Sequence, residues 1–258
     1  MNSNSMPHYC YRLRPMNDLT IDELVNHFLW FSKRSGFKDK YDANIGAFIE
    51  DTPQIKRGLQ LRYTEEGVNE IIRQMDNVGI CCFTKKIPAK HIIGKFPKGN
   101  RSICIEYDKK TLEDYFENSD YALPNPFHDV VYDDQPTKME TDGLYHILWE
   151  KSEYGKVYKS INDVFSDIRT VDKLFQLLLT RINSKYGIQR EMRIILGGRN
   201  LQNKDLSQSG YRVDIPKEAI NKVYIINRPD SQFCSKLENI DYLKNKIVYK
   251  INHATPKT

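Results

Sequence analysis

The sequence lacks the features that mark secreted, membrane-spanning and disulfide-linked chains. No basic segment followed by an apolar run opens it, and no apolar stretch approaches the roughly 18 residues of a membrane-spanning helix. Its five cysteines are an odd number and form no Cys-x-x-Cys pair. These absences predict a cytoplasmic protein with no membrane partner, whose thiols are structural and unlinked. The cysteines are Cys10, Cys81, Cys82, Cys104 and Cys234.

The short motifs of the commonest catalytic and nucleotide-binding sites are also absent. There is no Walker A loop, no Gly-x-Ser-x-Gly elbow and no Gly-x-Gly-x-x-Gly turn. The six histidines form no His-x-His or His-Glu-x-x-His pattern, so each is expected to be structural. A site in this protein must therefore be inferred from less familiar residue combinations.

What is present is the composition of an ordinary folded protein. The chain has 258 residues, of which 40% are hydrophobic and 28% charged, and its formal net charge is +5. It contains no repeat, low-complexity tract or obvious linker. We expect one domain that spans residues 1–258.

Hydrophobic periodicity predicts more strands than helices. Strands are expected at 8–14, 29–32, 78–83, 102–107, 129–132, 144–149, 191–196, 211–215, 222–227 and 246–251. Helices are expected at 20–27, 64–75, 111–116, 170–185 and 231–244, the first with Thr20 and Glu23 as a capping box. Residues 36–53 are expected to form a long ordered loop. Because the strands do not alternate strictly with helices, the predicted fold is α+β, with a mixed, mostly antiparallel sheet flanked by helices.

The most concentrated charge lies in residues 85–101, which contain six Lys or Arg, one His and no acid. Two Pro and two Gly keep the segment out of regular structure, and backbone N–H groups beside basic side chains can cradle phosphate. A nucleotide or a nucleic acid would suit it, and the alternative is a solvated loop. The candidate phosphate-binding residues are Lys85, Lys86, Lys90, Lys95 and Arg101.

Four carboxylates define a second hypothesis. Asp39 and Asp42 lie in the expected loop, and Glu106 and Asp108 lie at the end of the strand at 102–107. Carboxylates of this kind bind divalent metals in nucleases. No recognised metal motif joins these acids, and loop Asp residues commonly form Asx turns, so no metal is assigned.

A third candidate site lies where the expected helix at 170–185 meets the strand at 191–196. Gln189, Glu191 and Arg193 share one face if the strand begins there. A carboxylate at a strand start, with an amide two residues earlier, can orient a ribose hydroxyl and stabilise an oxocarbenium-like centre. The alternative is a structural pair between Glu191 and Arg193.

Several segments together resemble the bacterial family called domain of unknown function 2971, whose members resemble proteins encoded near phage-defence genes. The matching segments, in the family's order, are Tyr11-Arg12-Leu13-Arg14, Leu29-Trp30-Phe31-Ser32, Phe37-x-Asp39-x-x-Asp42, Cys82-Phe83-Thr84, residues 102–108 and Glu191-x-Arg193. The chain departs from the family pattern at Lys38 and Lys40, at the basic segment, and at Gln189. The resemblance implies a toxic or antiphage effector, for which a partner defence protein is a further expectation.

The order of these parts also loosely resembles ADP-ribosyltransferases, which implies an NAD cofactor. On that comparison Arg12 or Arg14 holds the NAD phosphate, Thr84 supports the site, and Glu191 holds the nicotinamide ribose. The expected catalytic residues are then Glu191, Gln189 and Thr84, and the expected cofactor-binding residues are Arg12, Arg14, Arg193 and Ser32. The alternatives are a metal-dependent nuclease that uses Asp39, Asp42, Glu106 and Asp108, and a non-catalytic nucleotide or nucleic-acid sensor that uses residues 85–101.

Overall fold

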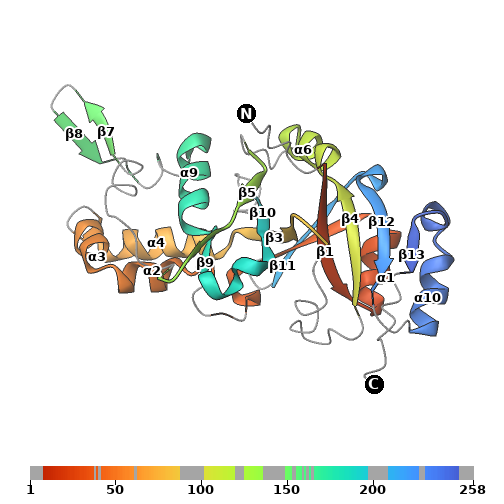
Figure 1. Ribbon diagram of the computed structural model, residues 1–258. Helices are drawn as coiled ribbons and strands as arrows, with labels where there is room; N and C mark the ends of the chain where they lie inside the picture. Colours follow the sequence, from red (N-terminus) through yellow and green to blue (C-terminus); the bar gives the residue numbers. More distant parts are fainter. Residues whose placement is uncertain are drawn as a thin grey trace, which may run out of the picture.

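The computed structural model contains one large sheet with helices on both of its faces (Figure 1). It describes residues 8–37, 39, 42–60, 63–87, 102–119, 125–135, 149–152, 155–158, 160, 163, 166–196, 209–226 and 230–249. The described residues contain no helix that is both long and apolar enough to cross a bilayer.

The large sheet has nine strands, and neighbouring strands follow the order β11-β2-β3-β1-β4-β12-β13, with β10 between β3 and β5. All of these pairs are antiparallel except β12 with β13, which confirms a mixed, mostly antiparallel sheet. The strands are β1 (Tyr9–Pro15), β2 (Phe28–Ser32), β3 (Gly79–Thr84), β4 (Ser102–Asp108), β5 (Phe127–Asp129), β10 (Glu191–Leu196), β11 (Gly210–Asp214), β12 (Ile220–Ile225) and β13 (Ile247–Tyr249).

Two small ladders lie outside this sheet. β6 (Val131–Asp133) pairs with β9 (Arg181–Asn183) in parallel, and β7 (Trp149–Ser152) forms an antiparallel pair with β8 (Gly155–Tyr158). The expected strand at 144–149 lies outside the described residues except for Trp149, where β7 begins.

The helices divide into two groups that cover opposite faces of the sheet. The α-helices are α1 (Asp18–Val25), α2 (Ile45–Asp51), α3 (Pro53–Gln60), α4 (Glu65–Asp76), α6 (Lys109–Glu117), α9 (Ile168–Leu178) and α10 (Ser231–Glu238). Short 3₁₀ helices are η1 (Arg34–Gly36), η2 (Ser184–Gln189), η4 (Lys217–Ala219) and η5 (Asp241–Leu243). In Figure 1, α2, α3, α4 and α9 lie at one end of the molecule, and α1 and α10 lie at the other.

The main core lies between the sheet and helices α1, α6 and α10. Alternate residues of the central strands point into it, among them Cys81 and Ile105, and meet Leu24, Leu112 and Leu237 from the helices. A second cluster joins Ile80 and Ile195, on the other face, to α2, α4 and α9. The strands β3 and β10 are therefore buried on both faces, which makes their backbone rigid.

Two sequence predictions about helices were wrong for reasons that the structure makes clear. The expected loop at 36–53 contains α2 and leads into α3: the Asn44 side chain accepts a hydrogen bond from Ala47 N and caps α2, and Pro53 opens α3. The expected helix at 170–185 ends at Leu178, because the residues after it pair with β6 as strand β9. Ile182 is buried in β9, so its helical spacing from the residues before it was a coincidence.

The predicted capping box is also wrong. The cap of α1 is Asn17, whose side chain accepts from Thr20 N at 3.0 Å. Glu23 is instead turned into the core, where it forms an ion pair with Arg12. By contrast, α4 begins where a helix was expected, and the Thr64 hydroxyl caps it by accepting from Gly67 N.

Candidate functional site

The register of the sheet places four polar side chains in one row across four adjacent strands. Glu191 on β10 is the partner of Thr84 on β3, Thr84 is the partner of Tyr11 on β1, and Tyr11 is the partner of Glu106 on β4. Paired residues project from the same face, with about 4.8 Å between strands. Glu191 and Glu106 thus stand about 14 Å apart at opposite ends of the row.

Glu191 and Arg193 share this face, and Arg193 is the most deeply buried charge among the described residues. Its guanidinium donates from Nε to Glu191 Oε1 at 2.6 Å, to the Leu179 carbonyl at 2.6 Å, and to Asp42 Oδ1 at 2.7 Å. The Phe37 ring lies against it, with the centroid 5.6 Å from the guanidinium carbon. Every nitrogen of this guanidinium has a partner, so Arg193 positions acids and is too deep to touch a ligand.

Glu191, Asp42 and Arg193, named here the acid–arginine cluster, combine two carboxylates with one cation. Burial lowers the pKa of the Arg193 guanidinium, but Glu191 and Asp42 more than offset this and raise its pKa well above the usual value. Burial raises the pKa of Asp42, against the opposing effect of Arg193. With both carboxylates ionised, the cluster carries a net charge of −1.

The two acids of the cluster retain an accessible edge. The side chain of Asp42 is 20% exposed and that of Glu191 is 10% exposed, whereas that of Arg193 is 0% exposed. A negative charge that is fixed by a buried cation and still reaches the surface can stabilise positive charge on a bound molecule.

Two tyrosines border the cluster. The Tyr132 hydroxyl accepts a hydrogen bond from Glu191 N at 2.6 Å, and burial raises the pKa of Tyr132 to about 12, so the phenol stays neutral. Tyr186, in η2, donates to Asp39 Oδ2 at 3.1 Å. Asp39 and Asp42 are linked through their backbone, with Asp42 N donating to Asp39 O.

Thr84 joins the cluster to the start of the basic segment. Its hydroxyl donates to the Lys86 carbonyl at 2.7 Å and so holds the turn that follows β3. Lys85 N donates to the carbonyl of Arg190, the residue before Glu191, at 3.1 Å. Lys85 and Lys86 therefore begin directly beside Glu191.

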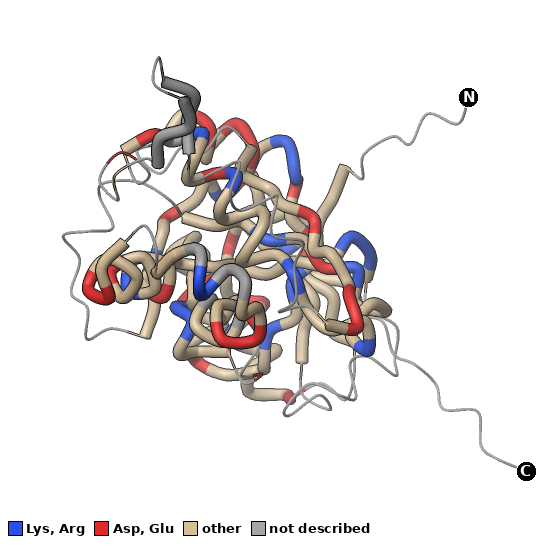
Figure 2. The backbone as a smooth tube through the Cα atoms, turned by 90° about the vertical axis from the view of Figure 1, so that its left-hand side faces the viewer, with Lys and Arg blue, Asp and Glu red and all other residues tan. Residues whose placement is uncertain are grey.

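The described residues include only the first three positions of the basic segment, 85–87. Lys90, Lys95 and Arg101 lie outside the described residues. Lys85 forms an ion pair with Asp129 at 2.7 Å. Elsewhere on the described chain, basic residues (blue) and acidic residues (red) are intermixed (Figure 2).

The structure does not bring Arg12 and Arg14 to Glu191. Residues on a strand alternate between its faces, and Tyr11, between Thr84 and Glu106 in the row, occupies the face of Glu191. Arg12 and Arg14 consequently point to the other face, where both form ion pairs with Glu23 at 2.7 Å. Within the described residues, Arg12 and Arg14 therefore do not share a site with Thr84 and Glu191, as the ADP-ribosyltransferase comparison would require.

Two further expected site residues lie apart from the cluster. Gln189 ends η2, and Arg190 after it has a left-handed backbone (φ 47°, ψ 52°), so Gln189 does not continue the face of β10. Ser32 pairs with Ile80, four residues before Thr84, which is about 13 Å along the strand. Neither is positioned to act together with Glu191.

The four acids of the nuclease hypothesis have separate partners. Asp42 binds Arg193, Asp39 accepts from Tyr186, and Asp108 caps α6 by accepting from Thr111 N. Glu106 is buried and accepts hydrogen bonds from Tyr224 and Asn221. Within the described ranges, no group of three or more His, Cys, Asp and Glu side chains is arranged to hold a metal ion.

Sequence reasoning did not assign Tyr11 or Tyr132 to this site, and it grouped Asp42 with the acids of the nuclease hypothesis instead of with Arg193. Asp42 meets Arg193 from 151 residues away, and Tyr132 meets Glu191 from 59 residues away. No local pattern signals such contacts. The position of Tyr11 could have been predicted in part, because alternation along β1 places Tyr11 and its neighbour Arg12 on opposite faces of the sheet.

Comparisons with known proteins add no relative to this picture. No family model matches the chain, no curated protein matches it, and no solved structure matches it either.

Proposed function

We propose that this protein is an NAD-using enzyme with ADP-ribosyltransferase-like chemistry, and that it acts as a toxic or antiphage effector. The observation that carries the proposal is the acid–arginine cluster: Glu191 opens a strand that is buried on both faces, is held by the wholly buried Arg193, and retains an accessible edge. A rigid element of this kind holds a reacting group precisely enough for catalysis.

The proposed reaction follows from the net negative charge of the acid–arginine cluster. When the bond between nicotinamide and ribose breaks, its electron pair leaves with nicotinamide and positive charge develops on the ribose. The Glu191 carboxylate would accept a hydrogen bond from a ribose hydroxyl and stabilise that charge, and the net −1 of the cluster strengthens the effect in a partly desolvated site. A water molecule or a target nucleophile then bonds to the ribose carbon and releases its proton.

The residues around Glu191 fit part of an NAD molecule. Thr84 stands directly across from Glu191, and Lys85 and Lys86 follow it with the charge that a pyrophosphate requires. Arg12 and Arg14 do not fit, because they project from the opposite face. We therefore assign the phosphate contacts to the start of the basic segment instead of to β1.

Two matched variants test the proposal. Glu191→Gln leaves Arg193 paired with Asp42, and Asp42→Asn leaves it paired with Glu191, so each variant retains a one-to-one ion pair. Each loses one charged hydrogen bond, so each should lower the free energy of unfolding by about 1.5–3 kcal/mol.

Their activities should differ sharply. Glu191→Gln should lower NAD turnover by about 100-fold or more, because transition-state charge stabilisation is lost, whereas Asp42→Asn should retain at least about ten times more activity than Glu191→Gln. The measurements are NAD consumption and growth of cells that express each variant. Full activity in a folded Glu191→Gln protein would end the transferase proposal. NAD binding by the wild type without turnover would favour the sensor.

A further inference from the structure

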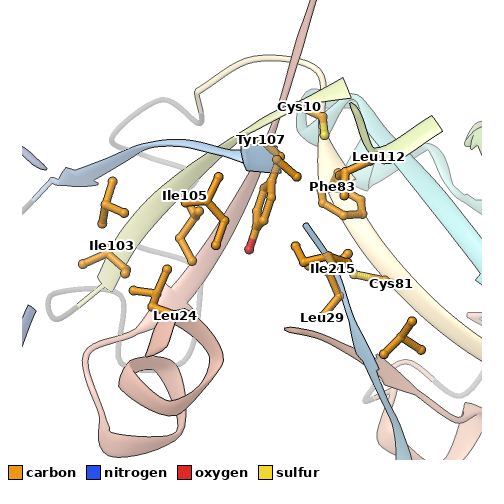
Figure 3. Close-up of a cluster of buried hydrophobic side chains, with 14 of the residues drawn as sticks. Cys10, Leu24, Leu29, Cys81, Phe83, Ile103, Ile105, Tyr107, Leu112 and Ile215 are labelled. Carbon is orange, nitrogen blue, oxygen red and sulfur yellow. The ribbon is translucent and has the colours of Figure 1, made fainter. Parts of the chain in front are cut away.

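A second charged cluster lies on the opposite face of the sheet, at the end of β1. Arg12 donates from one terminal nitrogen to Glu23 Oε1 at 2.7 Å and from the other to the Trp30 carbonyl at 2.8 Å. Tyr107 donates to the same Glu23 oxygen at 3.5 Å. In Figure 3 the Tyr107 ring stands among apolar side chains, with Leu24 and Ile105 nearby, so this polar group borders the main core.

Arg14 completes the cluster, but its guanidinium makes fewer hydrogen bonds than that of Arg12. Its Nε lies 2.7 Å from Glu23 Oε2 without the alignment of a hydrogen bond, and both atoms are buried. Within the described part of the chain, the terminal nitrogens of Arg14 donate to no group. A guanidinium has five N–H donors, so most of its bonding capacity here is open.

The charges of this cluster do not balance. Arg12 and Arg14 supply two positive charges, and Glu23 is the carboxylate that acts on both of them. Cys81 and Tyr107 also border the cluster, but burial raises the pKa of Cys81 to about 11 and that of Tyr107 well above its usual value, so both are neutral. The net charge is therefore +1 in a largely desolvated setting, which is costly unless an anion compensates it.

The excess charge is within reach of a small ligand. The side chain of Arg14 is 20% exposed, whereas that of Arg12 is 10% exposed and has both of its terminal nitrogens hydrogen-bonded. Burial lowers the pKa of Arg14, and the neighbouring Arg12 lowers it further. An oxyanion at the open end of Arg14 would relieve both effects.

We propose that Arg14, with Arg12 behind it, forms a phosphate-binding site on the α1 face of the sheet, separate from the site at Glu191. The planar fork of an arginine can bind a phosphate group through two parallel hydrogen bonds, and the ligand is free phosphate or the phosphate group of a larger molecule. The site does not depend on the transferase proposal, because the two lie on opposite faces.

Thermal melts with inorganic phosphate test this site at constant ionic strength, which is kept with sodium chloride. The melting temperature of the wild type should rise saturably with phosphate. Arg14→Gln should weaken the apparent affinity by about tenfold or more, and Arg14→Lys, which retains the charge without the fork, should fall between them. If Arg14→Gln fails to fold, the Arg14→Lys variant carries the comparison.

Two control variants separate the outcomes. Arg212→Gln removes an exposed arginine that is paired with Asp214 and should leave the phosphate effect unchanged. Lys85→Gln with Lys86→Gln removes the phosphate contacts proposed beside Glu191, so the part of the shift that this variant keeps and that Arg14→Gln loses belongs to the Arg14 site. An equal saturable shift in Arg14→Gln, no shift in the wild type, or a stronger response to acetate than to phosphate would each overturn the proposal.

Discussion

Glu191 and Arg193 lie two residues apart on β10 and are bonded to each other, with Arg193 Nε 2.6 Å from Glu191 Oε1. Alternation along a strand places such residues on one face, and here the face is covered by α9 and by the chain around Asp42. The pair therefore differs from a surface ion pair, because Arg193 is buried, and from an isolated buried pair, because Arg193 also binds Asp42. It combines a structural cation with a carboxylate that reaches the surface, and this combination underlies the proposed chemistry.

Asp42 should make the stability of the protein depend on pH in a definite direction. Burial raises its pKa on folding, above the usual value of about 4. Such a group contributes stability below its ordinary pKa, and this contribution is lost as the pH rises through the raised value. We expect the free energy of unfolding of the wild type to fall relative to that of Asp42→Asn as the pH rises from about 4. Urea unfolding at a series of pH values measures the difference, and a gain by the wild type instead would show that attraction to Arg193 outweighs burial.

Gly210 should tolerate no side chain. A Cβ at this position would lie 2.3 Å from the Phe31 carbonyl oxygen and 2.8 Å from the Trp30 ring, on the strand that pairs with β11. Gly210→Ala should therefore destabilise the protein by about 2 kcal/mol or more, because backbone must move. Gly46, in α2, provides the matched control, because a Cβ added there would meet only Asn44 Oδ1, at 3.4 Å. Gly46→Ala should therefore stabilise the protein by about 0.5–1 kcal/mol. Equal melting temperatures for the two variants would contradict the close approach of β2 and β11.

The basic segment should bind phosphate-bearing ligands through its charge. Replacing Lys85, Lys86 and Lys90 together by Gln should weaken binding of a single-stranded oligonucleotide. It should also reduce the slope of log affinity against log salt by about 2, since fewer counterions are released. The control replaces Lys217, Lys236 and Lys244, which changes the net charge equally. If the two triple variants behave alike, the segment acts only as a solvated surface.

Much of the framework follows from the sequence because it depends on local rules. The apolar run at 191–196 forms β10 with the predicted bounds, and Thr64 caps α4 as its position before an amphipathic pattern indicates. The shared face of Glu191 and Arg193 follows from alternation alone. All five cysteines are free, as their odd number and the absence of a Cys-x-x-Cys pair predicted.

Tertiary structure decided which of these residues meet. Alternation separates Arg12 from Tyr11, but only the register between β1 and β3 determines that Tyr11 takes the face of Glu191. Asp42 reaches Arg193 across 151 residues, a contact that depends on how α2 and α9 pack over the sheet. Local sequence specifies which way a side chain can point, whereas register and packing, which involve distant segments, specify what it points at.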